Sequence, residues 1–261
     1  MAVRKIIPLL LGKMTGAPWS LDYFWHCYPG NDIHVASILA FLIMTDDGPV
    51  LVDTGFRPEK RDKPLMAFGK EIIITDEMQL ENQLKNNGVS ADDIRTVIIT
   101  HLHNDHIGGA GLLKNAKFFI QRKEIEAAAA PLTCHMDMNG FNMHYNRKDV
   151  AMVMDEIWPR VEVIEGETEI AAGIKCVPFY NTHTPGSQAV YVSVDNMTAA
   201  IAGDVARNTE ANIVKQIPPA IFYNLEDTQK ALWKLKNDAD RFYLTHEYKV
   251  WEDYQKENSG K

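Results

Sequence analysis

The sequence predicts a mixed α/β protein, and three observations indicate this class. Apolar runs of strand length alternate with amphipathic helical patterns along the 261 residues. Several of these runs end at a histidine or an aspartate, as expected where loops gather over a rigid sheet. The chain also has no internal repeat, low-complexity tract or Pro/Ser-rich linker. We therefore expect one domain over residues 1–261.

Composition and charge narrow the function classes. Hydrophobic residues make up 46% of the chain and charged residues 24%, as in ordinary soluble proteins. The net charge is −8 with no basic tract to offset it, which argues against nucleic-acid or membrane-surface binding. Apolar segments stay well short of the ~20 residues of a membrane span. The three cysteines (Cys27, Cys134, Cys176) form no CxxC pair, which favours reduced thiols in a cytoplasmic protein.

The first elements are a strand and a hairpin. Ile6–Gly12 reads as a strand and not as a signal peptide, because its apolar run is short and Lys13 follows at once. Ala36–Met44 and Gly48–Gly55 read as a hairpin that turns at Asp46, Asp47 and Gly48. Asp76 and Gln79 resemble a capping box for a helix over Glu77–Asn86.

The remaining elements continue the alternation of strands and helices. Strands are expected over Thr96–Thr100, Lys117–Gln121, Ile174–Tyr180, Ser187–Val194, Thr198–Asp204 and Arg241–His246, and helices over Arg122–Ala130 and Leu225–Asn237. Residues 131–150 have no clear period and combine Met, Phe, Tyr and His, so we expect a segment that caps a substrate. The aromatic cluster in Met14–Tyr28 either folds over the same site or packs in the core.

Polar metal-binding side chains lie where four apolar strands end. The stretch HLHNDH follows Thr96–Thr100, and one histidine or aspartate follows each of three later strands. Imidazole and carboxylate are ligands of zinc, and also of iron, manganese and cobalt. Seven donors exceed the need of one tetrahedral ion but suit two ions about 3.5–4 Å apart. The predicted ligands are His101, His103, Asp105, His106, His183, Asp204 and His246.

These motifs resemble the metallo-β-lactamase superfamily. The matching stretches are THLHNDHIGG, NTHTPGSQ, AGD, LTHEY and the upstream VLVDTG. The resemblance implies a four-layer αββα sandwich, with two mixed sheets flanked by helices and two Zn²⁺ ions at one edge. It also implies one ion on His101, His103 and His183, and a second ion on Asp105, His106 and His246. Asp204 would bridge the two ions, and Asp53 would orient ligand imidazoles.

Within the superfamily the chain is most similar to the N-acyl homoserine lactonases. Those lactonases carry a tyrosine three residues after the bridging aspartate, where this chain has Arg207. Thr182 before His183 is a second departure, in place of the familiar PGH. Since arginine offers a planar fork of donors suited to carboxylate, we expect Arg207 to contact an anionic group of the substrate or its developing oxyanion.

The resemblance implies a hydrolase that opens a small lactone ring, with a substrate that carries an anionic or aromatic group. Two cations would lower the pKa of a shared water toward ~7, and the resulting hydroxide would attack the carbonyl. Arg207 or Tyr223 would hold the oxyanion, and Asp105 would pass a proton to the leaving group. A thioesterase of the glyoxalase II type and a cyclic amide or imide hydrolase remain alternatives on the same site, and a homodimer is one possible assembly.

Overall fold

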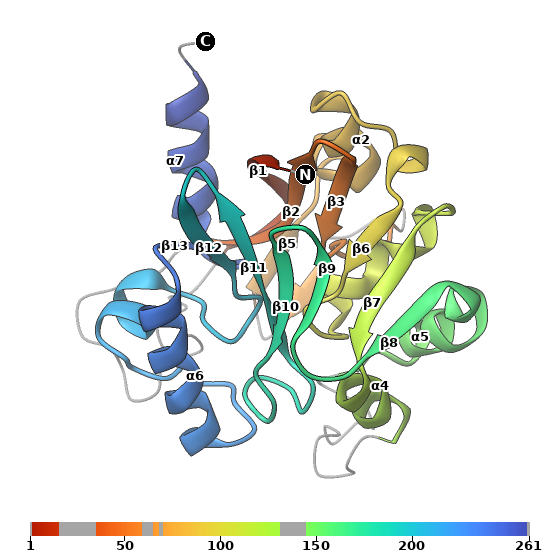
Figure 1. Ribbon diagram of the computed structural model, residues 1–261. Coiled ribbons are helices and arrows are strands. Elements are labelled where there is room, and N and C mark those ends of the chain that lie inside the picture. Colours follow the sequence, from red (N-terminus) through yellow and green to blue (C-terminus); the bar gives the residue numbers. More distant parts are fainter. Residues whose placement is uncertain (1, 16–34, 59–64, 68–69, 131–144, 260–261) are drawn as a thin grey trace.

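The computed structural model describes residues 2–15, 35–58, 65–67, 70–130 and 145–259. Two mixed β-sheets form its centre (Figure 1). The first sheet has eight strands, in the order β4 (Leu65–Ala67), β5 (Lys70–Ile73), β1 (Val3–Thr15), β2 (Val35–Thr45), β3 (Gly48–Val52), β6 (Thr96–Ile98), β7 (Lys117–Gln121) and β8 (Val161–Ile164). The second has five, in the order β13 (Arg241–Tyr243), β12 (Met197–Ile201), β11 (Gln188–Val194), β10 (Ile174–Pro178) and β9 (Thr168–Ala171).

Strand β1 shows how side-chain alternation builds two cores at once. Ile7 and Leu9 belong to the core cluster under the helices, whereas Ile6 and Leu10 belong to the cluster between the two sheets. Successive side chains of a strand point to opposite faces, so a strand with both faces covered reads as one apolar run. The run IIPLLLG is thus a buried strand, and its antiparallel pairing with β2 confirms the predicted first strand.

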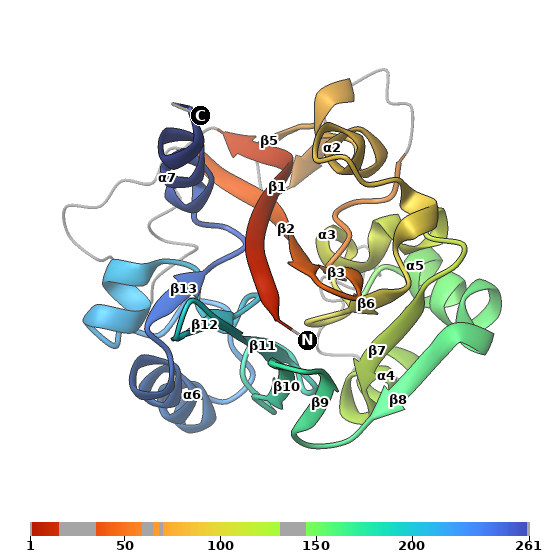
Figure 2. The ribbon, with the colours of Figure 1, turned by 45° about the horizontal axis from the view of Figure 1, so that its top comes forward.

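Helices cover the outer face of each sheet, which completes four layers. In the described part of the chain the α-helices are α2 (Leu80–Asn86), α3 (Asn104–Ile107), α4 (Arg122–Ala129), α5 (Arg147–Ala151), α6 (Leu225–Asp238) and α7 (Tyr248–Asn258). Leu84 of α2 and Ile125 of α4 pack on the first sheet, and Leu232 of α6 packs on the second. Figure 2 shows α6 beside β12 and β13, and α2 beside β1 and β2. The predicted αββα sandwich is confirmed.

Several predicted boundaries differ from the structure. The predicted capping box at Asp76 and Gln79 is wrong, because Asp76–Met78 forms a separate 3₁₀ turn and Gln79 has extended backbone angles. The hairpin of β2 and β3 is confirmed, with Thr45 paired to Gly48. Short or partly exposed elements that the sequence did not predict include β4, β5, β8, β9, α3, α5 and α7.

Some expectations fall partly outside the described residues. The aromatic cluster lies mostly in residues 16–34, and the proposed cap lies mostly in residues 131–144. The single-domain boundary also stays a prediction. Cys176 is a buried free thiol in the core between the sheets.

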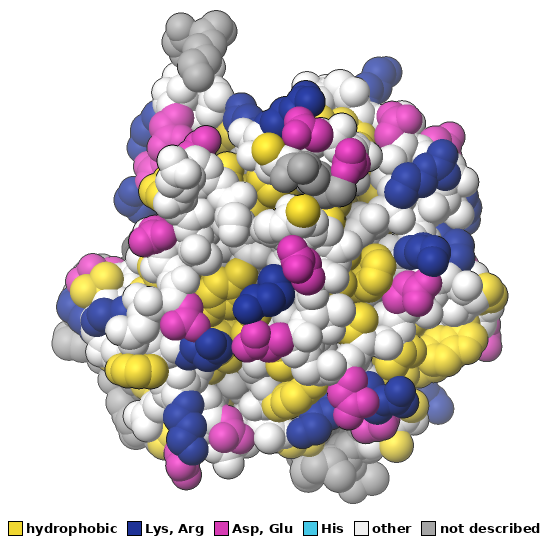
Figure 3. Space-filling model, in the orientation of Figure 1, with side chains coloured by type: hydrophobic (Ala, Val, Ile, Leu, Met, Phe, Trp, Pro, Cys, Tyr) yellow, Lys and Arg dark blue, Asp and Glu magenta, His cyan; other side chains and the backbone are white. Residues whose placement is uncertain are grey.

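The helices and the surface charge test whether the protein has features of a membrane-spanning or nucleic-acid-binding protein. Among residues with a described placement, no helix has the length and apolar character needed to cross a bilayer. On the face drawn in Figure 3, Lys and Arg side chains are interspersed with Asp and Glu, and no described histidine is visible. This face therefore presents mixed charge and no continuous basic surface.

Candidate metal centre

The first two histidines follow β6 in an extended segment that leaves the parallel part of the first sheet. His101 is buried, and its Nδ1 lies 3.1 Å from the hydroxyl of Thr100. Since that hydroxyl donates its proton to Asp53 Oδ2 at 2.8 Å, it accepts from His101 Nδ1–H. The Nε2 lone pair of His101 therefore points into the site.

Asp105 and His106 lie on the single turn of α3 that follows. His106 is fully buried, and its Nδ1 is 2.8 Å from Asp53 Oδ2. Asp53 also accepts from the backbone N–H of Thr100 at 2.8 Å, and its φ of 61° lies in the left-handed region. The Asp53 carboxylate thus orients the His106 imidazole, as the sequence predicts.

His183 lies in the loop between β10 and β11. Its Nδ1 is 3.3 Å from the carbonyl oxygen of Ile221, which can only accept, so the lone pair is on Nε2, the atom that faces His103. Gly186 lets this loop approach α4 closely, because an added Cβ would lie 2.1 Å from the backbone nitrogen of Glu124. The loop therefore has a fixed position against the first sheet.

Asp204 and His246 follow β12 and β13, which are parallel neighbours in the second sheet. Their carboxyl ends therefore meet at one edge, and the two side chains lie 3.1 Å apart, from His246 Nε2 to Asp204 Oδ2. His246 Nδ1 donates to the carbonyl oxygen of Ser37 on β2 at 2.7 Å. Gly203, with φ of 52°, permits the approach of Thr100, which an added Cβ would contact at 2.8 Å.

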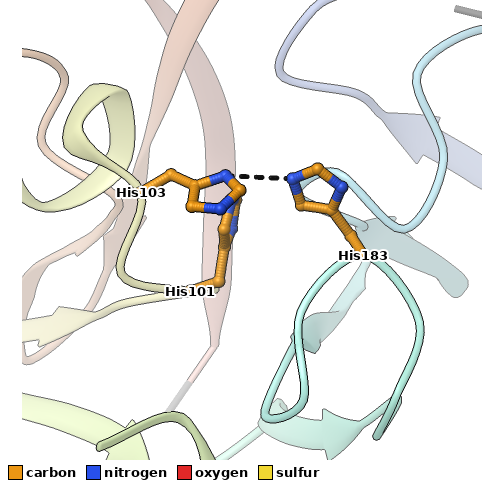
Figure 4. Close-up of side chains that lie close together, drawn as sticks. All are labelled: His101, His103 and His183. Atoms are coloured by element: carbon orange, nitrogen blue, oxygen red, sulfur yellow. Dashed lines mark hydrogen bonds between the residues drawn. The ribbon is translucent and has the colours of Figure 1, made fainter. Parts of the chain in front are cut away.

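All seven predicted ligands meet where the two sheets end. The side chains form three sets, and within each set the donor atoms lie within 4.8 Å of one another. The sets are His101 with His103 and His183; Asp105 with His106 and His246; and His101 with His106 and Asp204. Figure 4 shows His183 facing His103 and His101 from the opposite sheet, with His103 Nδ1 and His183 Nε2 3.0 Å apart. Asp204 lies between the first two sets, 3.3 Å from both His106 Nε2 and His183 Nε2.

The histidines differ in protonation. Burial lowers the pKa of His183 to about 3, and burial with the neighbouring imidazoles holds the pKa of His101 well below its ordinary value. These two rings are neutral at pH 7, which is the form that ligates a metal. Burial also acts against the charged form of His106, but Asp105 and Asp53 outweigh it and raise its pKa. The same carboxylates attract a cation to that set.

Arg207 lies inside the site. It is 8% exposed, and its Nη2 donates to Asp204 Oδ2 at 2.6 Å. Burial alone would raise the pKa of Asp204, but the neighbouring His246 and Arg207 outweigh it and hold that pKa well below its ordinary value. Asp204 is therefore an anion at the junction of the sets, and the prediction that Arg207 contacts substrate stays a prediction.

The chemistry of this donor set fits two divalent cations. Buried His101 Nε2 has no hydrogen-bond partner, and His106 Nε2 and Asp204 Oδ1 lie 3.3 Å apart without forming a hydrogen bond of good geometry. Unpaired buried polar atoms are costly unless something compensates them. Three imidazoles form one set, and two imidazoles with a carboxylate form the other, which are the ligand types of zinc and related metals.

Sequence reasoning missed two supporting residues, Glu124 and Ser37. Glu124 is buried beneath the loops that carry the histidines, and Ser37 holds His246 from a strand 209 positions away. Neither position carries a local signal, since a Glu in a first helical turn and a Ser in a strand are both ordinary. Tyr223, a predicted oxyanion donor, is 37% exposed, and its backbone N–H donates to Thr182 O.

We expect Asp53→Asn to weaken metal binding by about 10–100-fold, as the loss of a residue that orients a ligand does. Asparagine tolerates positive φ, so the change removes a charge without adding backbone strain. Metal affinity should be measured by competition with a chromophoric chelator. Asp47→Asn, at an exposed turn, is the matched control, and equal affinities in the two variants would contradict the role of Asp53.

The fold and this site define a class of protein. The model of the Metallo-beta-lactamase superfamily matches residues 35–246, and the chain belongs to that family. This confirms the predicted class, a metal-dependent hydrolase.

Its relatives include N-acyl homoserine lactonases. The chain is 27% identical over 215 residues to N-acyl homoserine lactonase AiiA of Bacillus thuringiensis subsp. kurstaki, covering 80% of this chain and 77% of the relative. It is 27% identical over 182 residues to N-acyl homoserine lactonase AiiB of Agrobacterium fabrum, covering 67% and 64%. The predicted similarity to this branch is confirmed.

Solved structures share the fold. An N-acyl homoserine lactone hydrolase with the product N-hexanoyl-L-homoserine at its catalytic metal center aligns with a TM-score of 0.77, at 22% identity over 97% of both chains. AidC, a dizinc quorum-quenching lactonase in complex with a product, aligns with a TM-score of 0.70, at 17% identity over 94% of this chain and 89% of that chain.

Proposed function

We propose that this chain is a dinuclear-metal hydrolase that opens a small lactone ring. The observation that carries the proposal is the position of Asp204, whose carboxylate lies between a set of three histidines and a set of two histidines and an aspartate. Such an arrangement suits two ions that share one carboxylate. The N-acyl homoserine lactonases among the relatives support lactones as the substrate class.

Seven residues would hold two Zn²⁺ ions, or Fe, Mn or Co in their place. One ion would take the set of His101, His103 and His183, and the other the set of Asp105, His106 and His246. When bound, the cations supply a nucleophile at neutral pH by lowering the pKa of a water, and they polarise the carbonyl. Asp105, whose side chain is 16% exposed, would take the proton that the attacking water loses and pass it to the leaving alkoxide.

Arg207 gives this site a preference for substrates with an anionic group. Its guanidinium is permanently charged and is held beside Asp204 by a charge-assisted hydrogen bond. It stands three residues after Asp204, where the lactonases that the sequence resembles carry a neutral tyrosine. The positive charge favours a lactone with a carboxylate, or the developing oxyanion of the reaction.

A substrate panel with metal-loaded protein tests this function. The panel contains acyl homoserine lactones of several chain lengths, aromatic and carboxylated lactones, a cyclic imide and S-lactoylglutathione. We expect turnover of the lactones. We also expect Arg207→Ala to lower kcat/KM for carboxylated lactones by about 10–100-fold, which corresponds to the loss of one hydrogen bond to a charged group. The decrease in kcat/KM for neutral lactones should be smaller.

Arg4→Ala is the control, because Arg4 is an exposed arginine that pairs with Asp46 at the end of β1 and β2 opposite to Ser37. Turnover of the thioester alone would refute lactone hydrolysis and assign a thioesterase of the glyoxalase II type. Turnover of the imide alone would assign a cyclic imide hydrolase. An equal loss on charged and neutral lactones in Arg207→Ala would refute the anion preference.

A further inference from the structure

Glu124 is a carboxylate buried beneath the metal-binding loops. It lies in the first turn of α4 and is 1% exposed. A buried carboxylate is costly unless it is fully hydrogen-bonded, so its partners indicate why it is there. All three donors with defined distances lie on the two loops that carry histidines of the first set.

Each oxygen of Glu124 holds a different loop. Oε1 accepts from the backbone N–H of Leu102 at 2.8 Å, and Leu102 lies between His101 and His103. Oε2 accepts from the hydroxyl of Thr184, which directly follows His183, at 2.7 Å and from the backbone N–H of Gly186 at 2.9 Å. One rigid carboxylate thus spans the gap between the first sheet's loop and the second sheet's loop.

Tyr145 adds a contact from a third direction. Its phenol lies against the Glu124 carboxylate, and its ring centroid is 5.9 Å from that of His103. Glu124 therefore contacts both the residue before His103 and the tyrosine whose ring lies edge-on to the His103 ring.

We propose that Glu124 is a positioning residue that sets the spacing of His101 and His103 against His183, and so tunes the affinity of that set for its ion. The inference rests on the proposed metal centre. In other hydrolases, partners that orient the ligands change metal affinity by about 10–100-fold. Glu124 differs from Asp53 because its hydrogen bonds hold two backbone segments beside the ligands, whereas Asp53 is hydrogen-bonded to the imidazole of His106 itself.

Glu124→Gln is the sharpest test. The two carboxylate oxygens face separate backbone N–H donors, so in either orientation the glutamine NH₂ group meets an N–H that it cannot accept from. We expect about 10–100-fold weaker binding of one ion, that of His101, His103 and His183, with the other unchanged. Glu126→Gln, an exposed glutamate on the same helix, is the matched control.

Co²⁺ absorption spectra identify which ion is lost. The variants His183→Ala and His246→Ala, each lacking one ligand of one set, provide the two reference spectra. Far-UV circular dichroism and thermal unfolding of the metal-free proteins report the fold separately. If Glu124→Gln does not fold, Thr184→Val removes one donor to the same carboxylate and should give a smaller loss at the same ion.

The outcomes separate the two proposals. If the unmodified chain binds no pair of ions, the proposed function fails. Suppose instead that the unmodified chain binds two ions and that Glu124→Gln, or Thr184→Val in its place, binds both ions with unchanged affinity. That result overturns the positioning role of Glu124. An equal loss of affinity for both ions overturns this role as well, because a general destabilisation of the fold would weaken both sites alike.

Discussion

Asp204→Asn is expected to cost the protein its metal, its activity and part of its stability. Asp204 lies at the junction of the two metal-binding sets, so we expect at least about 100-fold weaker metal binding, more than the loss of an orienting partner causes. The change also leaves Arg207 buried without the charge that it contacts at 2.6 Å. Removing one partner of a buried ion pair typically destabilises a protein by about 3–5 kcal/mol.

A double variant separates these effects. In Asp204→Asn combined with Arg207→Met, the charge of Arg207 is no longer stranded, so the free energy of unfolding of the metal-free protein should recover while metal binding and hydrolysis stay lost. Chemical denaturation measures the first quantity, and metal content with lactone turnover measures the second. Two bound ions in the single variant would contradict the bridging position of Asp204.

The ends of the apolar strands could be predicted because each strand carries its own local pattern. The runs before His101, His183, Asp204 and His246 are buried, and they bring those side chains to one edge of the sandwich.

The missed elements lack such a pattern. α3 has four residues, which is too short to show helical periodicity, and it nevertheless carries Asp105 and His106. α7 is largely polar and packs near β1 through aromatic rings, with Lys13 Nζ 4.9 Å from the ring of Tyr248. That contact joins residues more than 200 positions apart, and no window of sequence contains both.

The burial of individual polar side chains could not be predicted from the sequence either. Arg207 could be a surface residue by its sequence context alone, yet the structure places it against Asp204. Whether a charged side chain is buried depends on which segment packs over it, and that is decided by long-range contacts.

Asp105→Asn is expected to lower kcat for lactones by about 10²–10⁴-fold, the range of a lost general acid. Its Oδ2 lies 3.5 Å from His246 Nε2, and its side chain is 16% exposed, so it borders the site and can reach a bound substrate. Asparagine has the same shape, but its neutral amide cannot take up the proton of the attacking water and pass it to the leaving alkoxide.

The leaving group distinguishes a proton donor from a simple ligand. An alkoxide must be protonated as it leaves, whereas the thiolate of a thioester or the phenolate of an aryl ester leaves without a proton. If Asp105 donates the proton, Asp105→Asn should lose far more on lactones than on a slow aryl ester substrate. If Asp105 serves only as a metal ligand, both rates should fall by the same factor, together with the metal content. Because the two roles predict different ratios in one protein preparation, comparing the two substrates at equal metal loading decides between them.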